Sequence, residues 1–165
     1  MATDASWQVV AGDLDDPRVR NLLQTHVVAA LADMPCESCH ALDVAGLKRP
    51  NISFWAIWDS AELLGLGALK DIGDGHGEVK SMHTAANARG RGVGSAMVRH
   101  IVAAARARGF RRLSLETGAI AYFMAARRLY AAHGFVECGP YGAYHPDPNS
   151  VFMTLDLAAH PATST

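Results

Sequence analysis

The sequence has few cysteines, almost no net charge and no long apolar run, and each of these scarcities excludes a class of protein. Three cysteines in 165 residues are too few for a disulfide framework, and they favour reduced thiols and a cytoplasmic location. A formal net charge of −1 gives no reason to expect nucleic acid as a partner. No apolar run approaches the roughly 20 residues of a membrane-spanning helix. Residues 1–6 also lack the basic start and apolar stretch of a signal peptide, so we expect no membrane partner.

Hydrophobic residues, by contrast, make up half of the chain. This share is enough for a packed core and argues against disorder. Because there is no internal repeat and no linker-like stretch, we expect a single domain over residues 1–157. The small and polar tail, residues 158–165, is expected to be disordered.

The spacing of apolar and turn-forming residues predicts alternating strands and helices. Asp16 followed by Pro17 is typical of a helix start, and apolar residues follow at helical spacing. Gly109 is typical of the position just after a helix. These patterns predict the α/β class, a mixed sheet with helices on its faces. We expect strands over 7–11, 52–58, 63–69, 78–84, 111–117 and 151–157, and helices from residue 17 and over 42–47, 93–108 and 121–132.

A glycine-rich turn lies between an expected strand and an expected helix. It reads Arg89-Gly90-Arg91-Gly92-Val93-Gly94-Ser95. Backbone N–H groups at a helix start lack intrahelical partners, and the helix dipole adds positive potential, so such a turn favours an anion. The acidic residue of a dinucleotide fingerprint and the Gly-Lys-Ser/Thr of a Walker loop are both missing. The turn therefore predicts a site for a phosphorylated cofactor of another kind.

Two motifs in order resemble the GNAT acetyltransferase family. Residues 89–94 match its Arg/Gln-x-x-Gly-x-Gly/Ala signature, and residues 126–135 match the pattern Ala-x-x-Leu-Tyr-x-x-x-Gly-Phe. Residues 81–84 and 147–153 also resemble a bacterial subgroup called YsnE-like. The resemblance implies the GNAT fold: a mixed, mostly antiparallel sheet of six to seven strands with about four helices around it. Its central parallel pair would be splayed to admit CoA.

The resemblance further implies an N-acetyltransferase that moves the acetyl group of acetyl-CoA to a primary amine by direct transfer in a ternary complex. The CoA pyrophosphate would bind at the glycine turn, and the pantetheine arm would run beside the preceding strand. The N–H near Met82 would stabilise the oxyanion. The residues expected to bind the cofactor are Met82, His83, Thr84, Arg89, Gly90, Arg91, Gly92, Val93, Gly94 and Ser95.

Three residues are candidates for proton transfer. Glu78 matches the glutamate that acts as base in histone-type members, although a glutamate here could instead be a structural partner of Lys80. Glu116 is the alternative base, because it matches the glutamate of some ribosomal-protein acetyltransferases. Tyr130 matches the family tyrosine near the CoA sulfur and is the candidate acid, or else a core tyrosine. One departure from the family is Phe123, which stands where many relatives have an asparagine that holds the cofactor. The segment before it, residues 117–121, is about two residues longer than usual.

The acceptor side is less defined by the sequence. A small-molecule amine and a peptide amine both remain candidates, and His40 and Trp55 are expected to bind it. A second copy of the chain is a candidate partner, because family members often form homodimers. A catalytically silent acyl-CoA-binding module and a protein N-terminal or lysine acetyltransferase are the alternative functions. Further candidates for the pocket wall are Phe54, Tyr141, Tyr144 and His145.

A C-x-x-C-H motif spans residues 36–40. It matches the haem-attachment pattern, but no export signal accompanies it, and a zinc site from Cys36, Cys39 and His40 would lack a fourth ligand. We therefore expect no metal. The motif more simply belongs to the loop that walls the acceptor pocket in this family.

Overall fold

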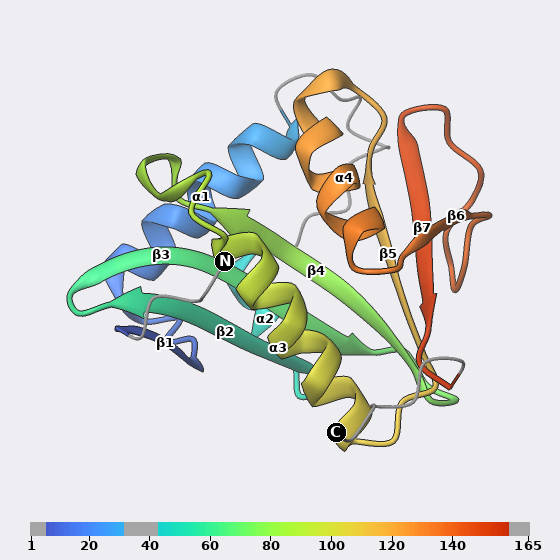
Figure 1. Ribbon diagram of the computed structural model, residues 1–165, viewed down its shortest axis with the longest axis horizontal. Coiled ribbons are helices and arrows are strands. Elements are labelled where there is room, and N and C mark those ends of the chain that lie inside the picture. The colour runs from blue at the N-terminus through green and yellow to red at the C-terminus, as the bar shows by residue number, and fades with distance from the viewer. Residues whose placement is uncertain (1–5, 32–42, 159–165) are drawn as a thin grey trace.

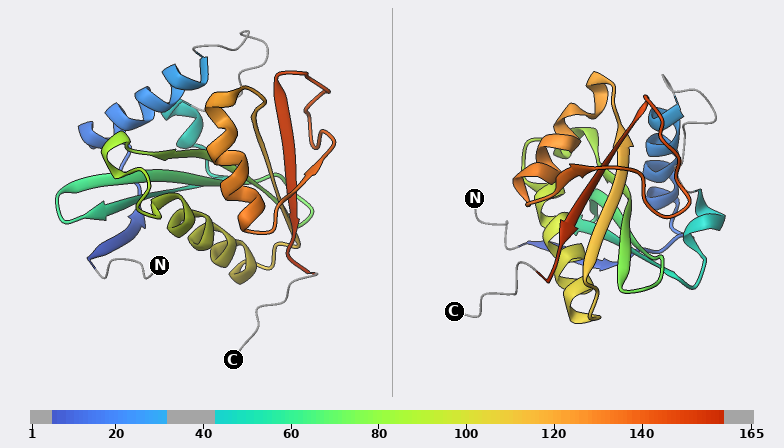
Figure 2. Two further views of the ribbon diagram at one scale, coloured as in Figure 1. Left: turned by 45° about the horizontal axis from the view of Figure 1, so that its top comes forward. Right: turned by 90° about the vertical axis from the view of Figure 1, so that its right-hand side faces the viewer.

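A seven-stranded sheet lies between two layers of helices in the computed structural model, which describes residues 6–31 and 43–158 (Figure 1). The expectations for Cys36, Cys39, His40 and the tail after residue 158 lie outside the described residues. In the second view of Figure 2, α3 and α4 lie on one side of the sheet and α1 and α2 on the other. Within the described ranges, no helix combines the length and apolar character that crossing a membrane requires.

The strand order is β1-β2-β3-β4-β5-β7-β6, with one parallel pair, β4–β5, and antiparallel pairing elsewhere. This arrangement confirms the predicted fold class. The strands are β1 (Trp7–Ala11), β2 (Ile52–Asp59), β3 (Glu62–Asp71), β4 (His76–Thr84), β5 (Arg112–Gly118), β6 (Val136–Cys138) and β7 (Ser150–Asp156). The helices are α1 (Pro17–Leu31), α2 (Val44–Leu47), α3 (Val93–Ala107) and α4 (Met124–Ala132), with short 3-10 turns at Ala86–Ala88 and Ala121–Phe123.

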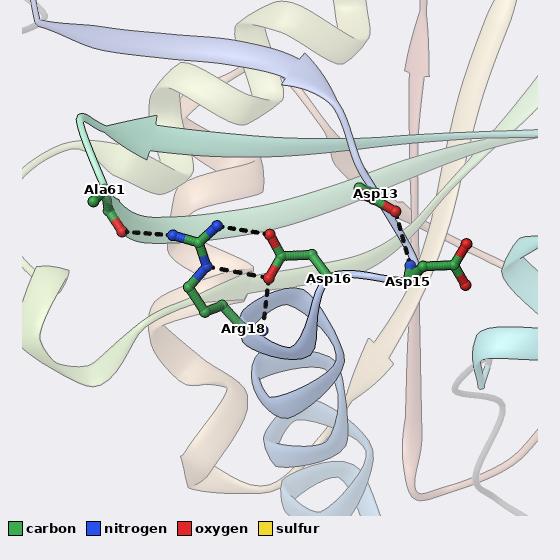
Figure 3. Close-up of polar contacts among 5 residues, drawn as sticks. All are labelled: Asp13, Asp15, Asp16, Arg18 and Ala61. Atoms are coloured by element: carbon green, nitrogen blue, oxygen red, sulfur yellow. Dashed lines mark hydrogen bonds and ion pairs between the residues drawn. The ribbon is translucent and has the colours of Figure 1, made fainter.

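The start of α1 follows the capping chemistry that the sequence predicted. Asp16 Oδ1 accepts a hydrogen bond of 2.8 Å from the Arg18 backbone N–H, and Pro17 occupies the first helical position. The Arg18 side chain also pairs with the Asp16 carboxylate and donates to the Ala61 carbonyl, as Figure 3 shows. The cap therefore also ties α1 to the turn between β2 and β3.

Apolar side chains on each face of the sheet meet a different helix layer. The predicted stripe of α3, Val93, Met97, Ile101 and Ala105, is at most 2% exposed and packs on one face. On the other face the apolar residues of α1 and α2 pack against β2 and β3. That second cluster comprises Val19, Leu23, Leu47, Phe54, Ala56, Leu66 and Ala68.

Two details differ from the sequence-based expectation. Strand β6 was not predicted, because three residues at a sheet edge are too few to show an alternating pattern. Residues 121–123, expected as the first turn of an α-helix, form a 3-10 turn instead. Arg127 holds this entry in place, since its Nη1 donates to the carbonyls of Gly118 and Ile120 at 2.6 and 3.1 Å.

Strands β4 and β5 pair only over their first halves. The parallel register runs from His76 opposite Arg112 to Val79 opposite Leu115, and the strands then separate (Figure 1). In the second half of β4, Ser81 has a φ of 55° and the register with β3 shifts by one residue, which is a β-bulge. The splayed parallel pair that the resemblance implied is thus present.

Candidate functional site

A cavity of about 460 Å³ opens where β4 and β5 separate. Its wall comes from α1, from the end of β4 with the glycine turn that follows it, and from α4 with the 3-10 turn before it, three regions that are distant in the sequence. Nine of the ten residues predicted to bind the cofactor line it, although their role in binding stays a prediction. The lining residues are His26, Ala29, Met82, His83, Thr84, Ala88, Arg89, Gly90, Gly92, Val93, Gly94, Ser95, Tyr122, Phe123, Ala125, Ala126, Leu129 and Tyr130.

The remaining predicted residue, Arg91, has its side chain elsewhere. Its Nη2 lies 3.7 Å from Asp59 Oδ2, and its guanidinium lies over the Trp7 ring at 5.5 Å. The Arg91 side chain thus links the turn to β1 and β2, while its own backbone still belongs to the turn.

The glycine turn has the backbone geometry of an anion cradle. Gly90 and Gly92 have φ values of 77° and 88°, and no atom lies within 4 Å of the position where a Cβ would stand on either residue. Helix α3 begins at Val93, and the N–H of Ala96 donates to the Gly92 carbonyl at 3.0 Å. The N–H groups before Ala96 are those that have no acceptor within an α-helix. Open space, free amides and the helix dipole together suit a phosphate.

The second half of β4 offers its backbone edge to the same cavity. β5 pairs with β4 only as far as Val79, so the edge of β4 that faces β5 has no ladder partner there beyond this residue. Met82, His83 and Thr84 lie on this stretch and line the cavity. An extended ligand with amide groups can therefore bind here as an added strand would.

Tyr130 lies deep in the cavity, at 6% exposure, with its ring against Phe135. Burial raises the pKa of its phenol above the usual range. The hydroxyl therefore keeps its proton at neutral pH and can donate a hydrogen bond into the cavity.

Glu78 lies on the other side of β4, in a network of donors. It is 3% exposed, and its Oε2 accepts hydrogen bonds from the hydroxyls of Tyr141 at 2.7 Å and Tyr144 at 2.6 Å. Lys80 Nζ lies 3.5 Å from the same oxygen and 3.2 Å from the Tyr144 hydroxyl. Burial, followed by the Glu78 charge, raises the pKa of both phenols. The carboxylate thus fastens the loop between β6 and β7 to the sheet.

A second cavity, of about 650 Å³, adjoins this network. Lys70, which is paired in register with Glu78, contributes to its wall. Tyr141 and Tyr144, predicted as wall residues of the acceptor pocket, both line it, whereas His145 is exposed on the same loop. The cavity gives this face of the sheet room for an acceptor molecule.

Glu116 stands near Glu78 in a different environment. Ser114 is the register partner of Glu78, so the alternation along β5 places Glu116 on the same face, just beyond the last paired residue. Its Oε2 accepts a hydrogen bond of 2.8 Å from the Ser150 hydroxyl. Burial raises the pKa of Glu116 to about 7, while Ser150 and the positive charge of Lys80 act against this shift. Glu116 is therefore half ionised near neutral pH.

A histidine pair lies between the two cavities and was not anticipated from the sequence. His26 Nδ1 and His83 Nδ1 are 3.3 Å apart, and both rings line the cavity beside the glycine turn. Burial lowers the pKa of His26 to about 4, and the His83 and Lys80 charges add to this effect. The sequence predicts only that His26 lies on the helix that starts at residue 17, because a single sequence gives no sign of its partner on β4.

Trp55 does not reach the face of the sheet that carries Glu78. In the β2–β3–β4 register, Phe54 shares a face with Ala68 and Lys80, and Trp55 points to the opposite face. There its ring packs against His100 of α3, with a centroid separation of 4.8 Å. Alternation along a strand thus separates Trp55 from the Glu78 network. Among the described residues, no group of three or more His, Cys, Asp or Glu side chains could hold a metal ion.

Comparisons with known proteins agree on one family. The model of the acetyltransferase (GNAT) family matches residues 22–135. An uncharacterized N-acetyltransferase of Escherichia coli, YedL, is 48% identical over 92% of this chain and 95% of its own length. YsnE, an uncharacterized N-acetyltransferase of Bacillus subtilis, is 46% identical over 88% of this chain and 96% of its own. An acetyltransferase of Bacillus subtilis solved in complex with CoA shares the fold, with a TM-score of 0.67, 15% identity and coverage of 92% and 99% of the two chains.

Proposed function

The chain belongs to the acetyltransferase (GNAT) family, and from that premise we propose that it moves the acetyl group of acetyl-CoA to a primary amine while both substrates are bound. The proposal rests on one observation. The cavity with the anion-binding turn and two carboxylates, the buried Glu78 and the half-buried Glu116, lie close to the place where the β4–β5 pairing ends at Val79 and Leu115. A direct transfer needs donor and acceptor to meet in this way.

Backbone groups would hold most of the cofactor. The amides at the start of α3 and the guanidinium of Arg89 suit the pyrophosphate, and the open edge of β4 suits the amide groups of the pantetheine arm. When bound, acetyl-CoA supplies a thioester carbonyl carbon that a neutral amine can attack. The N–H of Met82, beside the bulge at Ser81, is the candidate donor to the oxyanion.

Of the two carboxylates, Glu116 is the better candidate for the base. A general base works best when its pKa lies near the working pH, and Glu116 meets this condition with a pKa of about 7. Glu78 Oε2 already faces three donors, from Tyr141, Tyr144 and Lys80. We assign Glu78 the positioning of the loop that covers the acceptor cavity, which reverses the order of preference drawn from sequence alone.

Two further groups have assigned tasks. Tyr130 keeps its proton because burial raises its pKa, so it donates a hydrogen bond to the departing sulfur. The low pKa of His26 keeps this ring neutral at neutral pH, and a neutral ring does not repel an amine substrate.

The test measures release of free thiol from acetyl-CoA against a panel of small amines, amino acids and N-terminal peptides. Wild type is compared with Glu116→Gln and Glu78→Gln, two changes that remove the same charge from neighbouring positions. We expect turnover on one acceptor class, with a loss of kcat of at least about 100-fold in Glu116→Gln. A smaller loss is expected in Glu78→Gln, mainly in the KM for the acceptor.

Three other results would favour a different function or a different base. CoA binding without turnover on any acceptor would favour a silent acyl-CoA-binding module. Turnover confined to peptides would favour a protein N-terminal or lysine acetyltransferase. A collapse in Glu78→Gln with normal turnover in Glu116→Gln would return the base to Glu78.

A further inference from the structure

The rim of the cofactor cavity carries an aromatic side chain that the proposed chemistry does not use. Tyr122 is 51% exposed and yet lines the cavity together with Phe123. The two rings meet edge to face, with centroids 4.9 Å apart and planes at 87°. Large aromatic side chains contribute most to binding energy when a ligand covers them. An exposed ring at the edge of a ligand cavity is therefore a candidate contact for a bound ligand.

The ring stands on a rigid base. Phe123 packs so closely on Gly118 that any Cβ at this glycine would collide with the Phe123 ring. The guanidinium of Arg127 closes the segment, since it donates to the carbonyls of Gly118 and Ile120. A ring fixed in this way loses little conformational freedom when a ligand stacks on it.

We propose that the Tyr122 ring is the stacking platform for the adenine of CoA, an inference that rests on the proposed function. The glycine turn fixes the pyrophosphate, and the pantetheine arm runs inward along β4 toward the deeply buried Tyr130. The adenosine arm, on the other side of the pyrophosphate, must therefore run outward. Of the Tyr and Phe rings that line the described cavity, Tyr122 is the exposed one, and aromatic rings stack on a nucleic-acid base without needing a specific hydrogen bond.

This arrangement also accounts for Phe123. The family asparagine at this position would hold the cofactor by a hydrogen bond, which phenylalanine cannot make. In this chain Phe123 instead supports Tyr122 through its edge-to-face contact. The segment before α4 thus offers the cofactor an apolar contact in place of the polar contact that the resemblance implied.

The test combines variants of the protein with fragments of the ligand. Calorimetry measures the Kd of CoA, of adenosine 3′,5′-bisphosphate and of 4′-phosphopantetheine for wild type, Tyr122→Ala and Tyr122→Phe. We expect Tyr122→Ala to weaken CoA and the adenosine bisphosphate by about tenfold, with phosphopantetheine unchanged. Tyr122→Phe keeps the ring and should bind all three ligands as wild type does. Met124→Ala is the control, because Met124 is 41% exposed nearby and is not part of the cavity wall.

The outcomes separate this inference from the proposed function. Equal CoA affinity in wild type and Tyr122→Ala would overturn the inference, and so would a loss confined to phosphopantetheine. A wild-type chain that binds none of the three ligands would contradict the proposed function itself. Unchanged circular dichroism in Tyr122→Ala confirms that a loss of affinity does not come from unfolding.

Discussion

The two sides of β4 present different chemical groups, with backbone groups on one side and side chains on the other. On the side that we propose for the cofactor, the chain presents backbone: a turn with two glycines at positive φ, the first amides of α3 and an unpaired strand edge. On the side that we propose for the acceptor, it presents side chains, with Glu78 bound by two tyrosines and a lysine and Glu116 bound by Ser150.

The difference predicts how each side responds to substitution. A backbone site depends on dihedral angles and on the absence of a pairing strand, so most side-chain changes leave it intact. A side-chain network depends on each member, because removal of one partner leaves a buried polar group without its hydrogen bond. We therefore expect backbone changes to abolish cofactor binding and side-chain changes to act on rate, stability and acceptor choice.

The largest effect is expected from Gly92→Glu. A side chain at a φ of 88° is strained, and a carboxylate at the start of α3 occupies and repels the pyrophosphate position. CoA affinity measured by calorimetry should fall by at least about 100-fold. The matched control is Gly109→Glu, since Gly109 has a φ of 78° and equally open surroundings at the far end of α3. Equal loss in both variants would mean that strain, and not the binding site, is responsible.

Tyr130→Phe tests the buried tyrosine in the wall of the proposed cofactor cavity. Loss of one hydrogen bond to the departing sulfur should lower kcat by about tenfold. The Kd of CoA and the melting temperature should stay close to wild type, because the ring is retained. An unchanged kcat in stopped-flow measurements of thiol release would remove Tyr130 from the mechanism and leave it as a core residue.

A smaller effect, mainly on stability, is expected from Tyr144→Phe. The change deletes a hydrogen bond to the buried Glu78 carboxylate and should lower the free energy of unfolding by about 1.5 kcal/mol. CoA affinity should not change, because this network lies on the acceptor side. Urea denaturation measures the first quantity and calorimetry the second, with Tyr122→Phe as a control for loss of an exposed hydroxyl. A clear loss of CoA affinity would show that the two sides are not independent.

The smallest effect is expected at the bulge. Ser81 holds a φ of 55°, and its buried Oγ has no hydrogen-bond partner among the described residues. Ser81→Gly relieves the strain at a cost in chain entropy, so stability should change by less than about 1 kcal/mol, with activity kept. Ser81→Val should be clearly less stable, since a branched side chain resists this backbone conformation. If the valine variant melted at the wild-type temperature, the strained bulge would have no role in stability.

The contrast between the two sides also explains which of them could be predicted from the sequence. The proposed cofactor site comes from one continuous stretch of the chain, because the glycines at positive φ and the start of the helix follow one another. Residues 89–95 therefore predicted an anion site before any fold was known. The parallel pairing follows from the strand-helix-strand order, and the splay of the two strands was predicted from the resemblance to the GNAT family.

The acceptor side could not be predicted in this way. Glu78 and Tyr144 are 66 residues apart in sequence, and no local pattern links them. Whether Glu78 or Glu116 is the better base depends on which one faces three donors, which only the packed structure reveals. Trp55 was predicted to bind the acceptor, yet it lies on the face opposite Glu78, because the strand register, and not the residue type, decides where a side chain points. The His26–His83 pair could not be predicted either, because the two residues lie on different elements, 57 residues apart in sequence.

The most direct test of the account is the pH dependence of kcat/KM in wild type and Glu116→Gln. The pKa of Glu116 is raised to about 7, so its ionised, basic form is lost as the pH falls through this value. The acceptor amine titrates equally in both enzymes, so the ratio of wild type to variant isolates the glutamate. We predict that this ratio is constant above about pH 8 and falls close to tenfold per unit below about pH 7. A ratio that stays constant from about pH 5.5 to pH 9 would contradict the assignment of Glu116 as the base.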